Sequence, residues 1–264
     1  MESHTRWTQI TTENPDHSRW YIDRFDKMRA AGVDLDGEAR TCDAIAPRAA
    51  RIIDAGCGPG RTAIELARRG HAVIGLDIDP QLIAEADRAA RAAGVDGACD
   101  RDVSATSRID RGTAQRAAQQ TGCQKDEPVT ISLPESDALF QPGVAQFREA
   151  NICYPYPRGV GGADLIVCAG NVMTFLAGQG PRLALEQFAA ALAPTGQVVI
   201  GFGTDRGYEM ETFAADCAAA GLVITQRFAT WQLAPWQPDA PFLVALLAPG
   251  VSHQHCASPA GPTR

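Results

Sequence analysis

The chain has 264 residues, of which 45% are hydrophobic and 21% are charged, and a formal net charge of −7. These proportions are ordinary for a folded protein, and the length suits one α/β domain with additions. The acidic balance disfavours a protein that grips nucleic acid through a broadly basic surface. No apolar run approaches the roughly 20 residues that cross a bilayer, and segment 1–20 lacks the apolar core of a signal peptide. We therefore expect a small-molecule partner, and neither a nucleic acid nor a membrane.

The cysteines and histidines indicate neither disulfides nor a metal site. The eight cysteines are scattered, and Cys57 and Cys168 fall in or beside expected strands, where a small buried thiol is the usual explanation. The His and Cys residues near the C-terminus lie in 251–264, a segment rich in Ser, Pro and Gly that we expect to be disordered. The expectation is a cytoplasmic protein with free thiols and no metal.

Residues 1–50 have a helical pattern. Residues 1–16 are polar, and we expect them to be frayed. From Asp16 onward, apolar residues recur at three- and four-residue spacing, which predicts a helix: Trp20, Tyr21, Phe25 and Met28. A second short helix is expected over 38–46. Two interpretations of the aromatic residues stay open, namely packing on the core or closure of Tyr21 and Arg24 over a ligand.

The stretch 51–79 organises the rest of the chain. The apolar pair Ile52–Ile53 ends at Asp54, as a buried strand would. Three glycines follow within five residues: Gly56, Gly58 and Gly60. Because glycine has no Cβ, this spacing lets the backbone turn sharply and lets a ligand approach it closely.

A helix and a second strand complete this unit. The segment 61–69 has an apolar face and ends at Gly70, which is typical of a short helix. The apolar run 72–76 then ends at Asp77. Strand, glycine turn, helix, strand and terminal acid together predict a nucleoside-binding βαβ unit.

Two features of the glycine turn bear on the cofactor. A dinucleotide fold has the fingerprint G-x-G-x-x-G, with a pyrophosphate on the helix N-terminus. Here the third glycine comes one residue early, and Arg61 stands where that fingerprint has glycine. Asp54 precedes the first glycine by two residues; it would repel a pyrophosphate and suits a ligand that carries an ammonium group. An NAD-dependent oxidoreductase is therefore disfavoured.

The segment Asp54-Ala55-Gly56-Cys57-Gly58-Pro59-Gly60 resembles motif I of the class I S-adenosylmethionine (SAM)-dependent methyltransferases, usually D/E-x-G-x-G-x-G. The resemblance covers roughly 51–94 and 142–248. It implies SAM as the cofactor, with both ribose hydroxyls bonded to Asp77, Ile78 beside the adenine, and segment 1–50 as a helical lid. The cofactor-binding residues that it implies in the turn are Asp54, Ala55, Gly56, Cys57, Gly58 and Gly60.

After Asp77, Asp79 as N-cap and Pro80 at the first helical position predict a helix that ends at Gly94. The polar stretch from about 95 to 141 is longer than the family usually has there, so we interpret it as an insertion. Only 129–133 looks like a strand. A loose excursion is favoured over a substrate-binding subdomain.

Two expected strands then end close to amides. The third strand, 144–150, ends at Asn151, and the near-continuous apolar run 163–169, typical of a central parallel strand, is followed closely by Asn171. The resemblance implies that Asn151 contacts the adenine amino group, with Glu149 or no such role as the alternatives. It also implies that Asn171 faces the methionine portion of the cofactor or the substrate.

The C-terminal part alternates strands and helices. We expect a helix from Pro181, a fifth strand at 197–202, a helix at 209–220 and two last strands at 222–231 and 242–248. The expected fold is α/β: a Rossmann-like, seven-stranded, mostly parallel sheet with a C-terminal antiparallel strand and helices on both faces, in a domain spanning 51–250. Since ligands lie at the carboxyl ends of such strands, the candidate substrate-binding residues are Tyr21, Arg24, Thr204, Arg206 and Trp231, with Trp236 beside them.

The sequence thus predicts a methyltransferase that acts on an unidentified small molecule. Methyl transfer from a sulfonium is an in-line displacement, and alignment of the reactants can supply roughly 7–11 kcal/mol. A general base is needed only for a nucleophile that is protonated at neutral pH, and Asp205 and Tyr21 are the candidates. The alternative from another class is a catalytically silent cofactor-binding or regulatory protein on the same fold.

Overall fold

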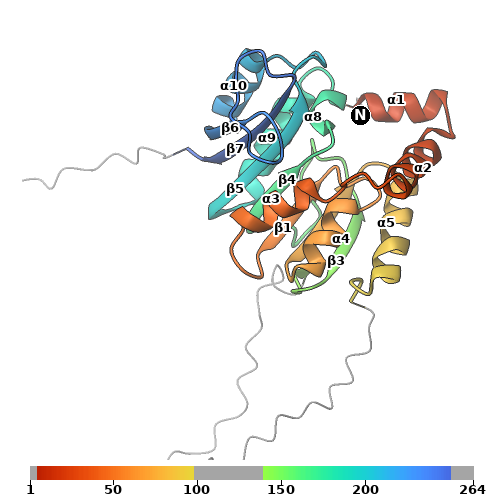
Figure 1. The fold of residues 1–264 in the computed structure, drawn as a ribbon. Helices are drawn as coiled ribbons and strands as arrows, with labels where there is room; N and C mark the ends of the chain where they lie inside the picture. Colours follow the sequence, from red (N-terminus) through yellow and green to blue (C-terminus); the bar gives the residue numbers. More distant parts are fainter. Residues whose placement is uncertain (1–4, 98–138, 251–264) are drawn as a thin grey trace, which may run out of the picture.

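The computed structural model describes residues 5–97 and 139–250 and has a seven-stranded sheet at its centre (Figure 1). The strand order is β3-β2-β1-β4-β5-β7-β6. Strands β1 to β5 pair in parallel, and β7 runs antiparallel to both β5 and β6. This arrangement confirms the expected Rossmann-like sheet. The strands are β1 (Arg51–Ala55), β2 (Ala72–Asp77), β3 (Ala145–Glu149), β4 (Ala163–Cys168), β5 (Leu192–Gly203), β6 (Leu222–Phe228) and β7 (Phe242–Pro249).

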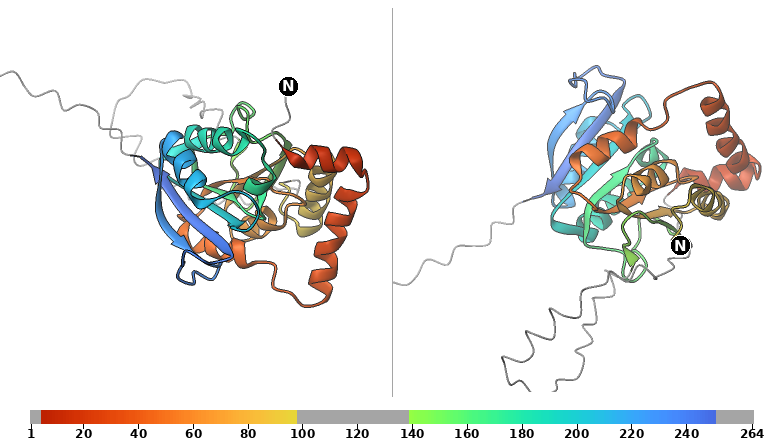
Figure 2. Two further views of the ribbon diagram at one scale, coloured as in Figure 1. Left: turned by 90° about the horizontal axis from the view of Figure 1, so that it is seen from above. Right: turned by 60° about the horizontal axis from the view of Figure 1, so that its bottom comes forward.

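Helices cover both faces of the sheet, and two further helices form an arm beside it (Figures 1 and 2). One face is covered by α3, α4 and α5, and the other by α9 and α10. The arm consists of α1 and α2. The described helices are α1 (Arg6–Glu13), α2 (His17–Ala30), α3 (Gly37–Ile45), α4 (Arg61–Arg68), α5 (Pro80–Ala93), α8 (Val172–Phe175), α9 (Gly180–Ala191) and α10 (Met210–Ala219).

Consecutive residues of one strand pack into opposite layers of the core. Ile52 packs with α3 and α4, whereas Ile53 packs on the α9 and α10 side, and both side chains are fully buried. Strand side chains alternate between the two faces of a sheet, so a strand covered on both sides needs apolar residues throughout. This explains why the buried parts of these strands are apolar, namely Ile52–Ile53 in β1, 72–76 in β2 and 165–168 in β4.

Several expected features lie outside the described residues. These are most of the insertion at about 95–141, including the strand-like segment 129–133, and the C-terminal segment 251–264. The two described ends of the insertion meet beside β3, because the amide of Ala145 donates to the carbonyl oxygen of Val95 (2.7 Å). Among the described residues, no helix is long and apolar enough to cross a membrane. The five described cysteines are free and buried.

Three expectations about local structure were wrong. Residues 6–13, expected to be frayed, form α1, with Thr5 as its N-cap. Trp20, for which core packing was one of the two interpretations, is 54% exposed. The fifth strand begins at Leu192 rather than at residue 197, with a register irregularity against β4. Gly196 allows this irregularity, since a Cβ there would lie 2.5 Å from the carbonyl oxygen of Ala163.

A buried histidine joins the elements at the amino ends of the strands. His71 is 1% exposed, and its Nδ1 accepts a hydrogen bond from the amide of Ala50 (3.2 Å). Because Nδ1 is an acceptor, the proton lies on Nε2, which donates to Asp43 (3.0 Å). Arg69 donates to the other oxygen of Asp43 (3.1 Å). His71 therefore holds α3 and the start of β1 against β2.

Replacement of His71 by Ala should lower the free energy of unfolding by about 1–3 kcal/mol, because the buried amide of Ala50 loses its partner and the Asp43 carboxylate keeps only Arg69. The His71 network lies at the amino ends of the strands, and ligands are expected at the carboxyl ends, so ligand affinity should not change. Chemical denaturation and calorimetry measure the two effects. Equal stability of H71A and wild type would show that this network contributes nothing to the fold.

Candidate cofactor and active site

The turn between β1 and α4 requires its glycines. Gly56, Gly58 and Gly60 have φ angles of 78°, 54° and 81°, in the left-handed region that only glycine adopts freely. A Cβ on Gly56 would lie 2.5 Å from the side chain of Val172, and one on Gly60 would lie 2.9 Å from the ring of Phe147. Close packing and backbone conformation therefore both exclude larger residues at Gly56 and Gly60, and the backbone conformation disfavours them at Gly58.

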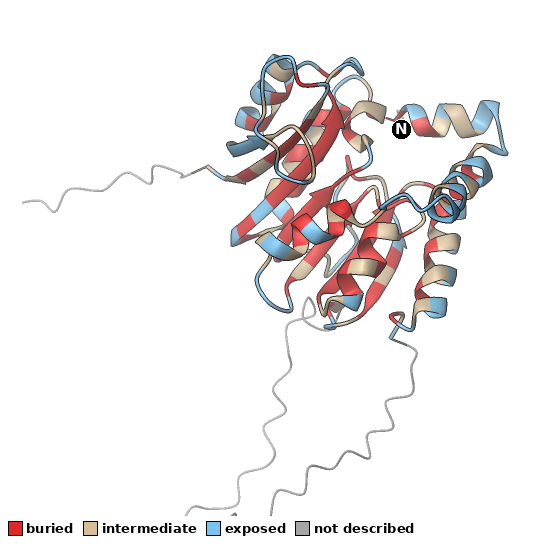
Figure 3. Cartoon of the chain, in the orientation of Figure 1, coloured by how far each residue is buried: buried red, intermediate tan, exposed pale blue. Residues whose placement is uncertain are grey.

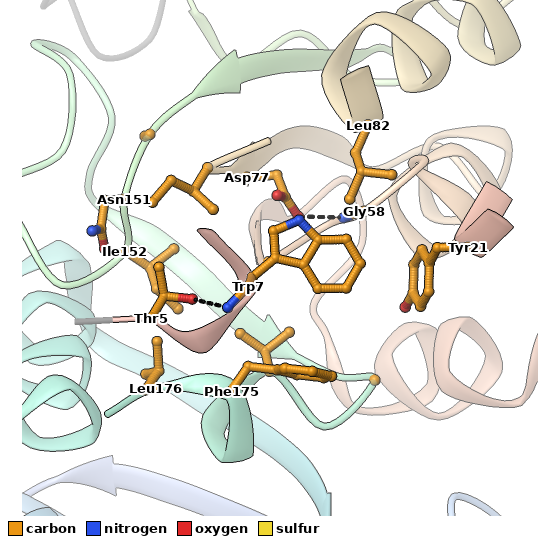
Figure 4. A pocket seen from close by; sticks show the side chains of 15 residues that line it. Thr5, Trp7, Tyr21, Gly58, Asp77, Leu82, Asn151, Ile152, Phe175 and Leu176 are labelled. Atoms are coloured by element: carbon orange, nitrogen blue, oxygen red, sulfur yellow. Dashed lines mark hydrogen bonds between the residues drawn. The ribbon is translucent and has the colours of Figure 1, made fainter. Parts of the chain in front are cut away.

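Asp77 fastens this turn to the end of β2. Its Oδ2 accepts from the amide of Gly58 (2.8 Å), and its Oδ1 accepts from the amide of Asp79 (3.0 Å). Burial raises the pKa of Asp77 to about 6, although these amide bonds oppose the rise. The carboxylate lines the cavity in front of the turn (Figure 4), where its remaining lone pairs can accept further hydrogen bonds.

Asp54 is the second carboxylate of the site. It is 2% exposed, and its Oδ2 is a buried atom with no hydrogen-bond partner among the described residues. Burial raises its pKa to about 7; Arg61 lowers the pKa and Asp77 raises it further. A buried carboxylate oxygen without a partner is costly, so this position suits a cationic group of a ligand.

Two cavities meet in front of the glycine turn. The first has about 580 Å³ of space that atoms do not fill, part of it open solvent, and its walls include Asp77, Ile78 and Asn151. The second reaches Asp54 and Arg61. Both are lined by Tyr21, Gly56, Gly58, Gly170 and Val172. The two cavities therefore adjoin each other at the carboxyl ends of β1, β2 and β4, with these five residues as shared walls.

The arm supplies aromatic walls to this space (Figure 4). Trp7 contacts the rings of Tyr21 and Phe175 edge to face, with centroids 5.2 and 5.7 Å apart. Tyr21 lies between the two loops, since Cβ atoms on Gly58 and Gly170 would come within 3.5 and 3.9 Å of it. Burial, followed by the charge of Asp77, raises the pKa of Tyr21 above its ordinary value.

Arg61 fixes α2 and α3 to the turn. Its guanidinium forms two hydrogen bonds with Glu38 (2.9 and 2.7 Å) and also donates to the carbonyl oxygen of Leu35. It lies over the ring of Phe25, 5.6 Å from the centroid. Arg61 and Glu38 are 14% and 18% exposed, so water screens this pair only partly. Arg61 stands where a dinucleotide fingerprint has glycine, and here it attaches α2 and α3 to the glycine turn.

Most of the cofactor residues expected from the sequence line these cavities. They are Asp54, Gly56, Cys57, Gly58, Asp77, Ile78 and Asn151, joined by Tyr21. Ala55 and Gly60 are buried neighbours that support the turn without lining a cavity. Asn171, at φ 66°, is also outside the lining, because its Oδ1 accepts from the amide of Gly203 (2.7 Å) and ties the ends of β4 and β5 together.

The candidate substrate residues lie elsewhere or at the margin. Arg24, Thr204, Asp205, Arg206 and Trp231 line neither cavity. The indole of Trp231 packs on β5 instead, where a Cβ on Gly201 would lie 2.4 Å from it. Trp236 packs on the core and lies under the guanidinium of Arg227, 4.6 Å from the ring centroid. Their roles in substrate binding stay predictions.

The sequence pattern missed several wall residues of the first cavity, namely Thr5, Trp7, Leu82, Ile152, Phe175 and Leu176. Thr5 offered a signal, because a threonine before a short polar run is a usual N-cap, and its hydroxyl accepts from the amide of Trp7 (3.1 Å). Trp7 does not belong to a run of regularly spaced apolar residues, and its partners Asp79 and Phe175 are far away in the chain. Among the described residues, no group of His, Cys, Asp or Glu is arranged to hold a metal ion.

Known proteins share this architecture and these motifs. A family model described as a methyltransferase domain matches residues 52–125. The structure of a TehB-like SAM-dependent methyltransferase from Corynebacterium glutamicum is 32% identical, covers 89% of this chain and 100% of its own, and superposes with a TM-score of 0.67. The chain belongs to the SAM-dependent methyltransferases. It is therefore a methyltransferase whose cofactor is SAM.

Curated relatives match shorter parts. A tRNA 5-carboxymethoxyuridine methyltransferase of Escherichia coli (strain K12) is 47% identical over 62 residues, which are 24% of this chain and 23% of the relative. A magnesium-protoporphyrin O-methyltransferase of Rhodobacter capsulatus is 64% identical over 33 residues, 12% of this chain and 15% of the relative. The chain thus covers less than a quarter of the length of each of these relatives.

The buried Asp54 of this methyltransferase should make the stability of the cofactor-free protein depend on pH. Its pKa is about 7 in the folded protein and about 3.9 in an unfolded chain. The folded state therefore binds the proton more tightly, and this contribution to stability is lost as the pH rises from about 4 to about 7. Replacement by Asn removes the titration, so the free energy of unfolding of D54N minus that of wild type should increase over this range.

Denaturant titrations at a series of pH values, without cofactor, measure this difference. D164N is a matched control, because Asp164 lies in β4 with its side chain 28% exposed and paired with Arg51. Parallel stability curves for D54N and wild type would contradict the raised pKa of Asp54.

Proposed function

We propose that SAM binds across the two adjoining cavities, with its adenosine in the first and its methionine portion in the second. The single observation that carries this proposal is the presence of one buried carboxylate in each of two cavities that share a wall, Asp77 in the first and Asp54 in the second. Asp77 suits ribose hydroxyls because it keeps acceptor capacity beside the glycine turn. Asp54 suits the methionine ammonium because its Oδ2 is buried without a partner. Ile78 and Asn151 lie where the adenine would be held.

The bound cofactor supplies a methyl group that the sulfonium already activates, so the protein mainly aligns the acceptor and excludes water. In this proposal Tyr21 closes the space above Gly58 and Gly170. Arg61 holds Phe25 and α3 behind it. Asn171 contributes indirectly by joining the ends of β4 and β5.

The acceptor, in our proposal, is a small molecule whose nucleophilic atom carries no proton at neutral pH. The titratable groups that line the two cavities are Tyr21, Asp54, Cys57, Arg61 and Asp77. Burial raises the pKa of Tyr21 and of Cys57, so both stay protonated. The two carboxylates are assigned to the cofactor, and Arg61 is paired with Glu38. Among the residues that the structure describes, no lining group is then left to serve as a general base.

A small molecule is preferred to a nucleic acid in this proposal, because Trp7 and Tyr21 of the arm form part of the cavity wall and the chain is acidic overall. The match to the tRNA methyltransferase covers 23% of that relative, and it provides no argument for an RNA acceptor beyond a shared segment. A tRNA acceptor is nevertheless a distinct outcome of the experiment below.

SAM and S-adenosylhomocysteine should bind this protein, and NAD should bind far more weakly. Replacement of Asp77 by Asn should weaken SAM binding roughly tenfold or more, since a hydrogen bond to a charged group contributes about 1.5–3 kcal/mol. Isothermal titration calorimetry measures all three ligands, with D87N, a change on the helix α5, as the control. Unchanged affinity in D77N would remove Asp77 from the ribose site.

Methyl label from SAM should pass to a component of a small-molecule extract and not to total tRNA. The two fractions are incubated separately with the enzyme and labelled SAM, and the product is identified by mass spectrometry. Because the site provides no base, Y21F should then keep kcat for that acceptor within a few fold, and kcat/KM should follow the pKa of the acceptor itself. Labelled tRNA would overturn the small-molecule proposal, and a loss of kcat in Y21F would make Tyr21 the base.

A further inference from the structure

The first helix is attached to the body of the protein mainly through its N-terminal turn. Thr5 pairs with Leu176 in an antiparallel bridge beside α8. Trp7 is 8% exposed, and its indole N–H donates to Oδ2 of Asp79 (2.8 Å). Trp7 is the one buried residue within α1, and the rest of the helix is exposed or intermediate (Figure 3). The bridge at Thr5 and the buried side chain of Trp7, which also packs against Tyr21, Phe175 and Leu82, therefore hold α1 across the front of the cofactor cavity.

The second helix is held differently. Ile22 and Ser18 of α2 are buried, and Phe25 lies under the guanidinium of Arg61. A short turn at 14–16 separates α1 from α2, and the two helices run in different directions (Figure 2). Ile22 shares its cluster with Trp7, but Ser18, hydrogen-bonded to Asp79, and Phe25, under Arg61, anchor α2 without any contribution from α1.

Trp7 also separates two cavities. Behind it, between α1 and the start of α5, lies a cleft lined by Thr8, Thr11 and Gln81. This cleft and the first cofactor cavity have only Trp7 and Ile78 in common. An outward movement of the indole would therefore join the cleft to the space assigned to adenosine.

Asp79 is arranged so that this movement leaves no buried charge without partners. Its carboxylate is the N-cap of α5 and accepts from the amide of Gln81 (2.8 Å). The hydroxyl of Ser18, on α2, donates to the same oxygen as Trp7 does. When Trp7 leaves, Asp79 keeps these two partners, so breaking the contact avoids the large penalty of an unpaired buried carboxylate.

We propose that α1 is a gate for cofactor exchange, with Trp7 as its latch on Asp79 and the turn at 14–16 as its hinge. This inference rests on the proposed position of SAM. The cofactor enters, and S-adenosylhomocysteine leaves, when the indole swings out and joins the cleft to the cofactor cavity. Trp7 thereby sets the residence time of the cofactor, and α2 remains the fixed wall of the site.

The first test replaces Trp7 by Phe, which keeps a ring and removes the N–H donor. Bound radiolabelled S-adenosylhomocysteine is chased with an excess of unlabelled compound. The dissociation rate should rise about tenfold in W7F, and the association rate should rise as well, because a gate limits both directions. Loss of a purely structural contact would instead lower the melting temperature and raise the dissociation rate alone.

W20F is the matched control, because Trp20 is an exposed tryptophan of the same arm that lines neither the cofactor cavities nor the cleft. Its exchange rates should equal those of wild type. S18A removes the other side-chain donor to Asp79 while leaving Trp7 in place. If W7F exchanges cofactor at the wild-type rate, or if S18A and W7F accelerate dissociation equally, Trp7 is not a latch.

The second test locks the gate. Thr5 and Leu176 face each other across an antiparallel bridge, where Cα atoms lie about 4.5–5.5 Å apart, a separation that a disulfide can span. In the double variant T5C/L176C, oxidation should stop exchange of S-adenosylhomocysteine, and reduction should restore it. Wild-type exchange by the oxidised, cross-linked protein would overturn the gate. Absence of any binding to wild type would instead overturn the proposed cofactor site.

Discussion

The hydrogen bond between the amide of Gly58 and Asp77 is the contact on which the ligand side of this protein depends. It joins the glycine turn after β1 to the end of β2, so that the two loops of the βαβ unit form one surface. The packing of Gly56 against Val172 then adds the loop after β4 to the same surface. Three loops that are distant in the chain thereby share one edge of the sheet, and the cavities lie between them.

The burial of two carboxylates makes this edge of the sheet electrostatically unfavourable. Asp54 and Asp77 both have raised pKa values because they are desolvated, and each raises or is raised by a neighbouring acid. An arrangement of this kind is unfavourable for an empty protein and favourable for one that binds a cation. In the proposed complex, the stability given up at these two carboxylates would be recovered by a ligand with a positive charge and hydroxyl groups.

The arm completes the site with apolar contacts anchored by polar ones. A run of rings crosses the mouth of the cavity, from Phe25 through Tyr21 to Trp7. At one end it rests on Arg61, which follows the glycine turn, and at the other on Asp79, which follows Asp77 by two residues. Both anchors thus belong to the βαβ unit that carries the glycine turn, so the arm and this unit together surround the cavities.

The sequence by itself determined the central unit and the sheet. Apolar runs, three glycines and two terminal acids are local signals, because strand burial, left-handed turns and helix ends are decided within a few residues. Asp54, Asp77 and the glycine turn were identifiable in this way, whereas the place of Ile78 and the antiparallel direction of the last strands followed from the resemblance to the class I methyltransferases. The expected element boundaries agreed within a few residues, except where the bulge of β5 depends on its neighbour β4.

Only the tertiary structure decided how the arm closes the site and which residues face the cavities. Trp7 belongs to no periodic pattern, and its partner Asp79 is 72 residues away. Arg61 is an ordinary first residue of a helix until Glu38, Leu35 and Phe25 surround it. Asn171 and Trp231 follow strands whose ends point to the ligand edge, yet Gly203 and Gly201 hold their side chains. Local patterns fix the backbone, whereas the direction of a side chain depends on long-range packing that no short stretch of sequence contains.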